Sequence, residues 1–404
     1  LKKKQLYKIL MDPVSIVTIK SKIPLFKGED LAERVELIEL EEVGFEIVSQ
    51  KDLYKIGDKA VYIQPDYCLP DTILFESFIR PGGDEGKSML GKINGEPRRI
   101  RAKKFNLHKG DNIVVYSNGI LLPMMEVYDQ LQFIGIAPDK MEENLTENLG
   151  ITKYEEPEYT SKGGLKTAGA MSFPAGIYKT DEENVNNLWN HIEKKIGYPI
   201  DLIGTVKEDG SSTTIGITDA IPEGFICSRN MRKKFFIKKV VGRRKKTFLE
   251  YLKFWKRHDL NIYQEMPSDD DFVKNGMPYL NMLKEKGYQN IILRGELNGG
   301  SLKGSGNKNN PASKRPVNIK FFGLDKFENG VSVKDTWKNL INLSDEIPID
   351  LVKQVFRGRY NSKEEILIEC NNYFKECMIE GIVIRTPDSS FSAKVMNLEY
   401  DSEK

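Results

Sequence analysis

The stretch DLIGTVKEDGSSTTIGI, residues 201–217, holds the most informative pattern in the chain. Apolar residues lie on both sides of Lys207-Glu208-Asp209-Gly210, and the Asp-Gly pair predicts a tight turn before a strand-like run at 212–217. A lysine amine acts as a nucleophile once nearby cations or burial lower its pKa. Taken alone, however, K-x-D-G is a weak pattern, because a solvated turn with these residues arises by chance in many proteins.

Composition and charge narrow the class of protein. The chain has 404 residues, which predicts two or three domains. With 39% apolar and 30% charged residues, it has enough apolar material for packed cores. The formal net charge is +2, so any affinity for nucleic acid must come from local basic patches rather than from bulk charge.

Cysteine and histidine are too few and too scattered for a zinc site or a disulfide framework. The four cysteines form no C-x-x-C pair, and the three histidines lie far apart in the sequence. We therefore expect a reducing, intracellular location, either cytoplasmic or nuclear. No apolar run approaches the roughly 20 residues that span a bilayer, so we expect no membrane association.

The N-terminal third has the pattern of an all-β module, which we assign to residues 12–138. Runs rich in β-branched residues recur with turn residues between them, as in a small barrel or sandwich. A five-stranded OB-type β-barrel fits the length, although spacing alone does not separate it from other small barrels. The expected strands span residues 14–25, 35–39, 44–48, 60–64, 112–116 and 119–122.

The rest of the chain mixes strand-like and helix-like stretches, which predicts an α+β domain at residues 179–404. Residues 139–178 show little periodicity and are predicted to be a linker. Thr180-Asp181-Glu182-Glu183 resembles a capping box, and apolar residues follow it at helical spacing, so we expect a helix to open this domain. Two further helices are expected at residues 247–257 and 362–376, and a Gly/Asn-rich loop at 301–315.

Further polar segments follow the Lys207 turn in order. Taken singly, each has an ordinary explanation as a strand end, a turn or a core position. As an ordered set they are much less expected by chance. They are Ser228-Arg229-Asn230, Arg294–Gly299 (RGELNG), Phe321–Asp325 (FFGLD), Glu380–Arg385 (EGIVIR) and Ser392–Asn397 (SAKVMN).

With this set in view, the chain resembles the covalent nucleotidyltransferases, the superfamily of polynucleotide ligases and mRNA capping enzymes. Within it, the chain is most similar to ATP-dependent RNA ligases of the Deinococcus/Naegleria type, in which an OB module precedes the ligase domain. KEDGSS resembles the motif that holds the nucleophilic lysine, and the later segments resemble the motifs that follow it. The resemblance covers nearly the whole chain and implies an ATP-grasp-like nucleotidyltransferase domain behind the OB-type barrel.

The resemblance implies a three-step sealing of RNA nicks with ATP and Mg²⁺ or Mn²⁺. Lys207 Nζ attacks the α-phosphate of ATP, which releases pyrophosphate and leaves a covalent lysyl-AMP. The AMP passes to a 5′-phosphate, and a 3′-hydroxyl then displaces it. Lys394 is expected to neutralise charge on the phosphate, and Asp209 to orient the lysine or the metal shell. The expected partner is a nicked RNA duplex or RNA/DNA hybrid, the expected role is RNA repair, and the expected state is a monomer.

The same resemblance assigns the groups around the nucleotide. Glu296 and Glu380 are expected to hold the metal ion, directly or through water, because Mg²⁺ prefers oxygen ligands and keeps several waters. Glu296 has the ATP ribose as an alternative partner, and Glu380 is alternatively a charged strand start. Thr205 and Val206, which precede the lysine, are expected at the nucleotide. Arg229 is expected at the ribose or the RNA end, with an ordinary surface arginine as the alternative.

Two positions depart from the family pattern. Ligases of this group commonly have a Phe directly before the Asp of the FFGLD segment, and this chain has Leu324. On a regular strand Phe322 shares a face with Leu324, so Phe322 either stacks on the adenine or is an ordinary core residue, and both stay open. Many relatives have two lysines, two residues apart, in the last motif. Here Ser392 takes the earlier place, and only Lys394 carries over.

Two basic clusters are candidate RNA contacts, whose hallmark is an affinity that falls with salt. The first is residues 232–246, which opens with Arg232, Lys233 and Lys234 and is alternatively a solvated face or a nuclear import signal. The second lies in the OB-type module, where Tyr67 and Phe105 are aromatic neighbours or core residues. It consists of Arg98, Arg99, Arg101, Lys103 and Lys104.

Two other functions stay open at this point. One is an ATP-dependent DNA ligase, or a GTP-using mRNA capping guanylyltransferase, with an unusual domain order. Those enzymes resemble one another in carrying an OB domain after the last motif, whereas this chain ends at Lys404, soon after Lys394. The other is a catalytically silent RNA-binding protein that kept a degenerate transferase core. The intact residues at the site argue against this alternative: Lys207, Glu296, Glu380 and Lys394.

Overall fold

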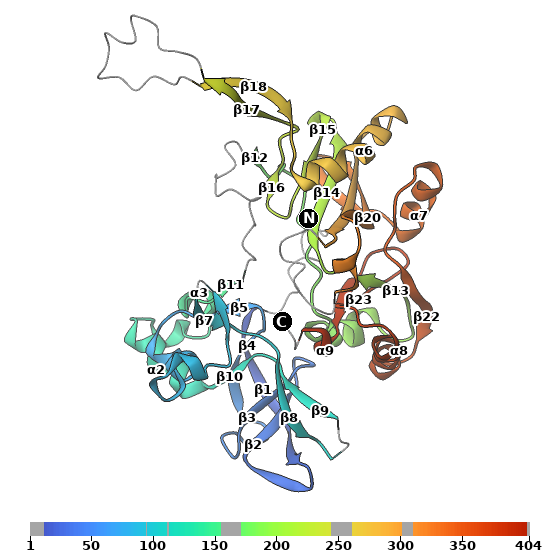
Figure 1. Cartoon of the computed structure of the whole chain (residues 1–404). Coiled ribbons are helices and arrows are strands. Elements are labelled where there is room, and N and C mark those ends of the chain that lie inside the picture. Colours follow the sequence, from blue (N-terminus) through green and yellow to red (C-terminus); the bar gives the residue numbers. More distant parts are fainter. Residues whose placement is uncertain are drawn as a thin grey trace, which may run out of the picture.

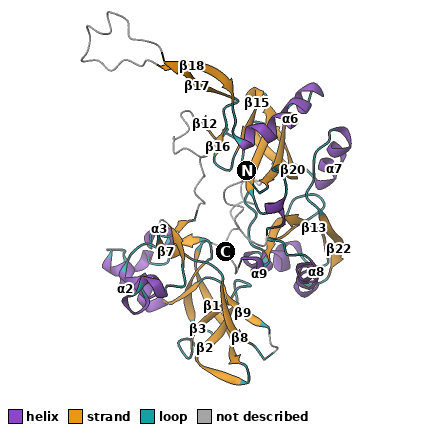
Figure 2. Cartoon of the chain, viewed as in Figure 1, coloured by secondary structure: helices purple, strands orange, loops and turns teal. Residues whose placement is uncertain are grey.

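The computed structural model describes residues 12–93, 95–110, 113–154, 171–243, 261–300 and 310–401. Figure 1 shows them in two lobes, with residues up to 153 in the N-terminal lobe and residues from 171 onward in the C-terminal lobe. Strands make up much of both lobes, and helices lie beside them (Figure 2). The class is therefore mixed α/β.

The main sheet of the N-terminal lobe is antiparallel and bent. Its order is β10-β4-β1-β2-β3, with β8 paired to the end of β1 and β9 paired to β8. The first half of β1 pairs with β4 and the second half with β2, and a register shift after Ile19 separates the halves. The strands are β1 (Val14–Lys27), β2 (Asp30–Leu40), β3 (Glu46–Gln50), β4 (Lys59–Ile63), β8 (Lys103–His108), β9 (Val114–Ser117) and β10 (Ile120–Pro123).

This sheet is half of a barrel. Between β9 and β3, two hydrogen bonds connect Asn118 N to Glu46 O at 3.0 Å and Val48 N to Ser117 Oγ at 3.0 Å. No ladder among the described residues joins β10 to β3 and closes the sheet. The structure thus shows a curved β module and not the closed OB-type barrel that the sequence led us to expect.

Helices and a second sheet, β11-β5-β7-β6, complete this lobe. Helix α2 buries Val127 and Leu131, and the segment around α3 buries Leu145 and Ile151, in one apolar core with the main sheet. Residues 141–153, inside the range predicted to be a linker, thus pack with the N-terminal lobe. The elements are α1 (Glu76–Ile79), α2 (Met124–Phe133), α3 (Leu145–Asn148), β5 (Tyr67–Cys68), β6 (Gly91–Ile93), β7 (Glu96–Arg99) and β11 (Thr152–Lys153).

The C-terminal lobe contains two antiparallel sheets. The larger has the order β12-β16-β15-β14-β19-β20-β21, and the smaller has the order β22-β13-β23-β24. The larger sheet comprises β12 (Met171–Ser172), β14 (Ser211–Thr218), β15 (Ile221–Cys227), β16 (Met231–Arg232), β19 (Ile291–Asn298), β20 (Asn318–Glu328) and β21 (Val331–Lys334). The smaller comprises β13 (Ile200–Lys207), β22 (Gln354–Tyr360), β23 (Gly381–Arg385) and β24 (Ser392–Met396).

Capped amphipathic helices cover these sheets. Helix α6 (Asp271–Glu285) begins at Asp270, whose side chain accepts from the Phe272 backbone, and it buries Leu280 and Leu283. Helix α7 (Trp337–Glu346) is capped in the same way by Thr336, and α8 (Lys363–Glu376) by Ser362. The expected helix at 362–376 is therefore confirmed. The expected helix at 247–257 lies outside the described residues, as does most of the loop at 301–315.

The helix expected to begin at Thr180 is wrong. Asn184 caps a single turn instead, and only short helical turns follow, at Val185–Asn187, α4 (Trp189–His191) and Ile192–Ile196. Residues 178–184, here called the strap, form no helix, and two of their carboxylates contact β24. Asp181 binds Lys394, and Glu182 binds Ser392.

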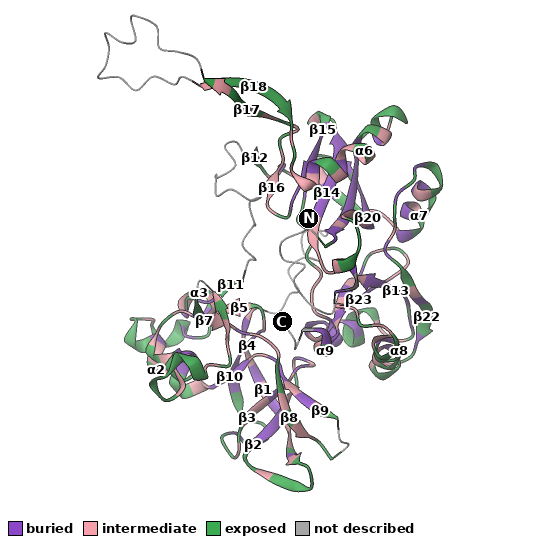
Figure 3. Cartoon of the chain, in the orientation of Figure 1, coloured by how far each residue is buried: buried purple, intermediate pink, exposed green. Residues whose placement is uncertain are grey.

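A two-stranded ribbon, β17 (Phe236–Arg243) paired with β18 (Asn261–Pro267), projects away from the body of the C-terminal lobe (Figure 1). Figure 3 shows that much of it is exposed. Its exposed residues include Phe236, Val240 and Tyr263, next to Lys238. The ribbon holds part of the basic stretch that was predicted to contact RNA.

The two lobes meet through the residues that follow the strap. Asn187 Nδ2 donates to Gln64 Oε1 at 3.1 Å, and Gly44 N donates to Asn186 O at 2.8 Å. Gly44 packs so closely on the Trp189 ring that a Cβ there would lie 2.6 Å from its Cδ1 atom. A glycine is therefore required for this approach of the two lobes.

Candidate active site

The Lys207 turn is the connection between the two sheets of the C-terminal lobe. Lys207 is the last residue of β13 in the smaller sheet, and Ser211 is the first residue of β14 in the larger one. The turn between them is tightly packed, because a Cβ on Gly210 would collide with the carbonyl oxygen of Leu297. Asn310 Nδ2 holds the turn from outside by donating to Asp209 O at 3.1 Å.

Strand register brings Glu380 to Lys207. Lys207 pairs with Gly381 across the β13–β23 ladder, so the residue before β23 lies beside the lysine. Lys207 Nζ and Glu380 Oε2 are 2.5 Å apart, although the residues are 173 positions apart in the chain. Both side chains are largely shielded from solvent, with 27% and 12% of their surface exposed. The pair lies at the end of β13 where the larger sheet begins.

Glu296 joins this pair from the larger sheet. It lies on β19, opposite Ser212 of β14, and its charge acts on Lys207. Burial lowers the pKa of Lys207, but Glu380 and Glu296 raise it by more, so the resting lysine is protonated. Burial raises the pKa of Glu296 to about 8; Lys207 opposes this shift and Glu380 adds to it. The resting site is therefore a coupled lysine–carboxyl cluster at the junction of two sheets.

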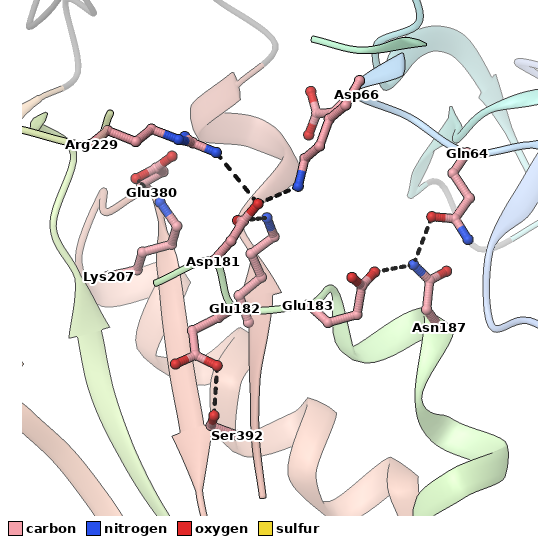
Figure 4. A network of polar contacts seen from close by, with 12 residues as sticks. Gln64, Asp66, Asp181, Glu182, Glu183, Asn187, Lys207, Arg229, Glu380 and Ser392 are labelled. Atoms are coloured by element: carbon pink, nitrogen blue, oxygen red, sulfur yellow. Dashed lines mark hydrogen bonds and ion pairs between the residues drawn. The ribbon is translucent and has the colours of Figure 1, made fainter. Parts of the chain in front are cut away.

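A second charged cluster lies beside the first and is centred on Asp181 of the strap (Figure 4). Lys394 Nζ lies 3.9 Å from Asp181 Oδ1, and Arg229 Nη2 lies 3.4 Å from Asp181 Oδ2. Lys153 of the N-terminal lobe also forms an ion pair with Asp181. Burial raises the pKa of Asp181, but Lys394, Lys153 and Arg229 lower it by more. Three cations thus gather around one carboxylate, an arrangement suited to binding phosphate oxygens.

Thr205 and Val206 are structural in this arrangement. The Thr205 side chain is fully buried, and its Oγ1 accepts from Arg385 Nη2 at 3.1 Å. Val206 N donates to Lys353 O at 2.9 Å. Arg385 also donates through Nη1 to Phe322 O at 2.6 Å. Their contact with a nucleotide stays a prediction.

Phe322 lies at a β-bulge, so the regular alternation assumed from the sequence is wrong here. Arg294 pairs with Gly323, but the next residue, Gly295, pairs with Phe321. As a result Phe321 and Leu324 both enter the main core, and Phe322 packs partly buried at its edge. Either role considered for Phe322, adenine stacking or plain packing, is compatible with this place.

The predicted RNA contacts are spread over both lobes. The arginines are bound to nearby carboxylates: Arg98 to Glu96 at 2.8 Å, Arg99 to Asp66 at 2.6 Å, and Arg232 to Glu223 at 2.8 Å. Arg99 also lies over the ring of Tyr154, and Lys233 over the ring of Phe272. By contrast, the remaining lysines are exposed at Lys103, Lys104 and Lys234. Arg101 packs against Gly91.

Two residues of the site were missed from the sequence. Asp181 was assigned to a helix cap, and Arg385 was quoted only as the end of a strand motif. Neither belongs to a local pattern that indicates its role, because Asp181 meets Lys394 and Arg385 meets Thr205 only in the folded chain. A buried arginine at the end of an apolar run is the one available signal for Arg385.

The donor groups fit a divalent cation that uses few protein ligands. Glu296 and Glu380 supply carboxylate oxygens, the ligands that Mg²⁺ and Mn²⁺ prefer. Among the described residues no group of three or more His, Cys, Asp or Glu side chains is placed to hold a metal ion. A cation here would therefore be held by Glu296 and Glu380, with water or substrate oxygens completing its coordination.

Structural comparison places the whole chain in a known fold. It is similar to the Naegleria gruberi RNA ligase with PPi, with a TM-score of 0.68 and 21% identity over 97% of this chain and 98% of the other. Mutants of that ligase solved with ATP and Mn and with AMP and Mn match with TM-scores of 0.67 and 22% identity. These matches cover 97% and 98% of this chain and 99% and 100% of the others. At this identity the likeness establishes the fold.

Comparisons based on sequence add no further relative, since no family model and no curated protein matches the chain. Among the described residues, no helix has the length and apolar character to cross a membrane.

Proposed function

We propose that this chain is an ATP-dependent RNA ligase that seals nicks between a 3′-hydroxyl and a 5′-phosphate through a lysyl-AMP intermediate. The observation that carries the proposal is the cluster of Lys207, Glu380 and Glu296 at the junction of two sheets, in the fold of an RNA ligase. The neighbouring cations around Asp181 add a site for phosphate groups.

In the first step, Lys207 forms a bond from Nζ to the α-phosphorus of ATP, and the bond from that phosphorus to the pyrophosphate oxygen breaks. The ammonium must lose a proton before the attack, and Glu380, hydrogen-bonded to Nζ, is placed to accept it. A second proton leaves the nitrogen as the phosphoramidate forms. Lys394 and Arg229 are placed to neutralise phosphate oxygens once ATP displaces Asp181 from them.

A divalent cation held by Glu296 and Glu380 would supply further positive charge at the α-phosphate. Such an ion would compete with the Lys207 ammonium for the Glu380 carboxylate. The neutral form of the lysine is favoured when a second cation lies nearby. The residues themselves thus couple cation binding to the release of a proton from the nucleophile.

In the second and third steps the AMP moves to the 5′-phosphate of RNA, and the 3′-hydroxyl displaces it. We assign the binding of a nicked RNA duplex or RNA/DNA hybrid to exposed lysines on both lobes: Lys103, Lys104 and Lys234. The curved β module is proposed to act as an OB-type nucleic-acid-binding module. We further infer a monomer that works in RNA repair, in a reducing compartment consistent with its free cysteines.

The test is a labelling assay. The purified protein is incubated with Mg²⁺ and α-labelled ATP or GTP and then run on a denaturing gel. We expect acid-labile label from ATP, and none in the Lys207→Ala variant, which keeps its fold by circular dichroism. Label from GTP would instead indicate capping chemistry.

Two further results would contradict the proposal. Labelling of the Lys207→Ala variant would mean that another residue is the nucleophile. No label with either nucleotide, in protein first treated with pyrophosphate to remove bound AMP, would favour a silent RNA-binding protein. If label forms, nicked duplexes with ribose or deoxyribose at the 3′ end then separate an RNA ligase from a DNA ligase.

A further inference from the structure

The last described segment of the chain is built into the candidate active site. After β24, which carries Lys394, the chain turns at Asn397 into α9 (Leu398–Asp401), which lies near β23 (Figure 1). Asn397 N donates to Glu380 O at 2.9 Å, and Asn397 Nδ2 donates to Ile379 O at 3.0 Å. The same side chain starts the turn, because its Oδ1 accepts from Glu399 N at 3.2 Å. The turn is therefore attached to the residue that pairs with Lys207.

Tyr400 on this turn reaches the opposite side of the site. Its side chain is fully buried, and its hydroxyl donates to Asp209 Oδ2 at 2.7 Å. Tyr400 and Asp209 are 191 positions apart in the chain. A buried phenol needs a hydrogen-bond partner, and a bond to a carboxylate is stronger than one between neutral groups. The bond therefore holds the carboxylate of Asp209 in one orientation.

Asp209 belongs to the turn that directly follows Lys207 at the end of β13. The next residue, Gly210, lies against Leu297 of the strand that carries Glu296. The backbone of Asp209 is held separately, by Asn310. Tyr400 thus contributes a bond to the side chain of Asp209, while Asn310 holds its backbone.

We propose that Tyr400 is a positioning residue for the formation of lysyl-AMP. By fixing the Asp209 carboxylate, it fixes the electrostatic surroundings and the direction of the Lys207 amine before attack. Because Tyr400 acts through Asp209, we expect its loss to change the rate of the step more than the affinity for ATP. This inference rests on the function proposed above.

The test compares two tyrosine variants that each lose one buried hydroxyl. Tyr400→Phe keeps the ring and removes the bond to Asp209. We expect lysyl-AMP formation at saturating ATP to slow about 10-fold, within the range that small misplacements cause, with KM for ATP nearly unchanged. Tyr62→Phe is the matched control, since Tyr62 is equally buried and donates to Asn118 O at 3.1 Å in the N-terminal lobe. It should leave the rate unchanged.

A second measurement separates positioning from a general loss of stability. In the Asp209→Asn background, Tyr400→Phe should cost little more, because its partner is already altered. The positioning role would be wrong if the rate losses of Asp209→Asn and Tyr400→Phe were fully additive in the double variant. It would also be wrong if Tyr400→Phe alone formed lysyl-AMP at the wild-type rate. A slower rate in Tyr400→Phe that is explained by a lowered unfolding temperature would also overturn the positioning role. Failure of the wild-type protein to form lysyl-AMP would instead overturn the proposed function.

Discussion

At the scale of single residues, the site depends on a contact made by Gly210, a residue without a side chain. Gly210 lies against the carbonyl oxygen of Leu297, so the turn that follows Lys207 touches the strand that carries Glu296. This contact fixes the distance between the lysine of one sheet and the carboxyl of the other. A methyl group here cannot be accommodated without moving backbone.

We therefore expect Gly210→Ala to lower stability by about 1–3 kcal/mol and to slow lysyl-AMP formation at least about 10-fold. Chemical unfolding and the labelling assay measure the two effects. Gly242→Ala is the control, because a Cβ there meets only ordinary contact with Ile262, at 3.6 Å. Equal behaviour of the two variants would show that the Gly210 contact is unimportant.

At the scale of elements, the strap connects the two sheets of the C-terminal lobe. Glu182 Oε2 accepts from Ser392 Oγ of β24 at 2.6 Å, and Glu182 Oε1 lies 3.3 Å from Lys334 Nζ of β21. Burial raises the pKa of Glu182, but Lys334 and Ser392 lower it by more, so the pKa of Glu182 in the folded chain lies below its ordinary value of 4.5. The carboxylate therefore stabilises the fold only while it is ionised.

This predicts a pH-dependent effect of Glu182→Gln. The unfolded-state pKa is near 4.5 and the folded-state pKa is lower, so the stabilisation is complete above pH 4.5 and is lost as the pH falls through the folded value. We expect a deficit of roughly 1–3 kcal/mol at pH 7, which shrinks as the pH falls below about 4.5. Thermal unfolding from pH 3 to 7 measures it, with the exposed position Glu143→Gln as control. A deficit independent of pH would contradict the argument.

At the scale of the whole molecule, the lobes approach each other over a small and specific contact. Gly44 from the N-terminal lobe lies on the ring of Trp189, and Lys153 reaches the Asp181 cluster beside Lys207. The candidate site therefore includes a group from each lobe. Separating the lobes would remove the Lys153 cation from the others.

A larger side chain at position 44 should separate the two lobes. We expect Gly44→Val to raise the radius of gyration in small-angle X-ray scattering and to weaken lysyl-AMP formation, while circular dichroism stays unchanged. The cause is the 2.6 Å approach that a Cβ would make to Trp189. Gly242→Ala again serves as control. An unchanged radius of gyration would show that the lobe contact tolerates the added volume.

Sequence patterns were sufficient to predict the structural features that depend only on residues close together in the chain. The β-rich character of the N-terminal lobe, the helix at 362–376 and the turn at Lys207 follow from periodicity, capping residues and an Asp-Gly pair. The ordered motifs also named Lys207, Glu296 and Glu380, which the structure brings together. Their individual roles stay predictions.

What could not be predicted depends on contacts between distant segments. The capping box at Thr180 is a correct local pattern, but ion pairs of Asp181 and Glu182 with other elements outweigh a modest helix preference. The β-bulge at Phe322 and the opening between β3 and β10 depend on strand register. No single stretch of sequence encodes register at such separations.

The long separation in sequence of Lys207 from Glu380 and Tyr400 has a consequence while the chain is being synthesised. Lys207 leaves the ribosome well before the residues that surround it in the fold, since synthesis runs from the N-terminus. A nascent chain that has exposed only Lys207 lacks Glu380, its ion-pair partner. If the proposed function holds, chains interrupted before residue 380 would form no lysyl-AMP and would not consume ATP.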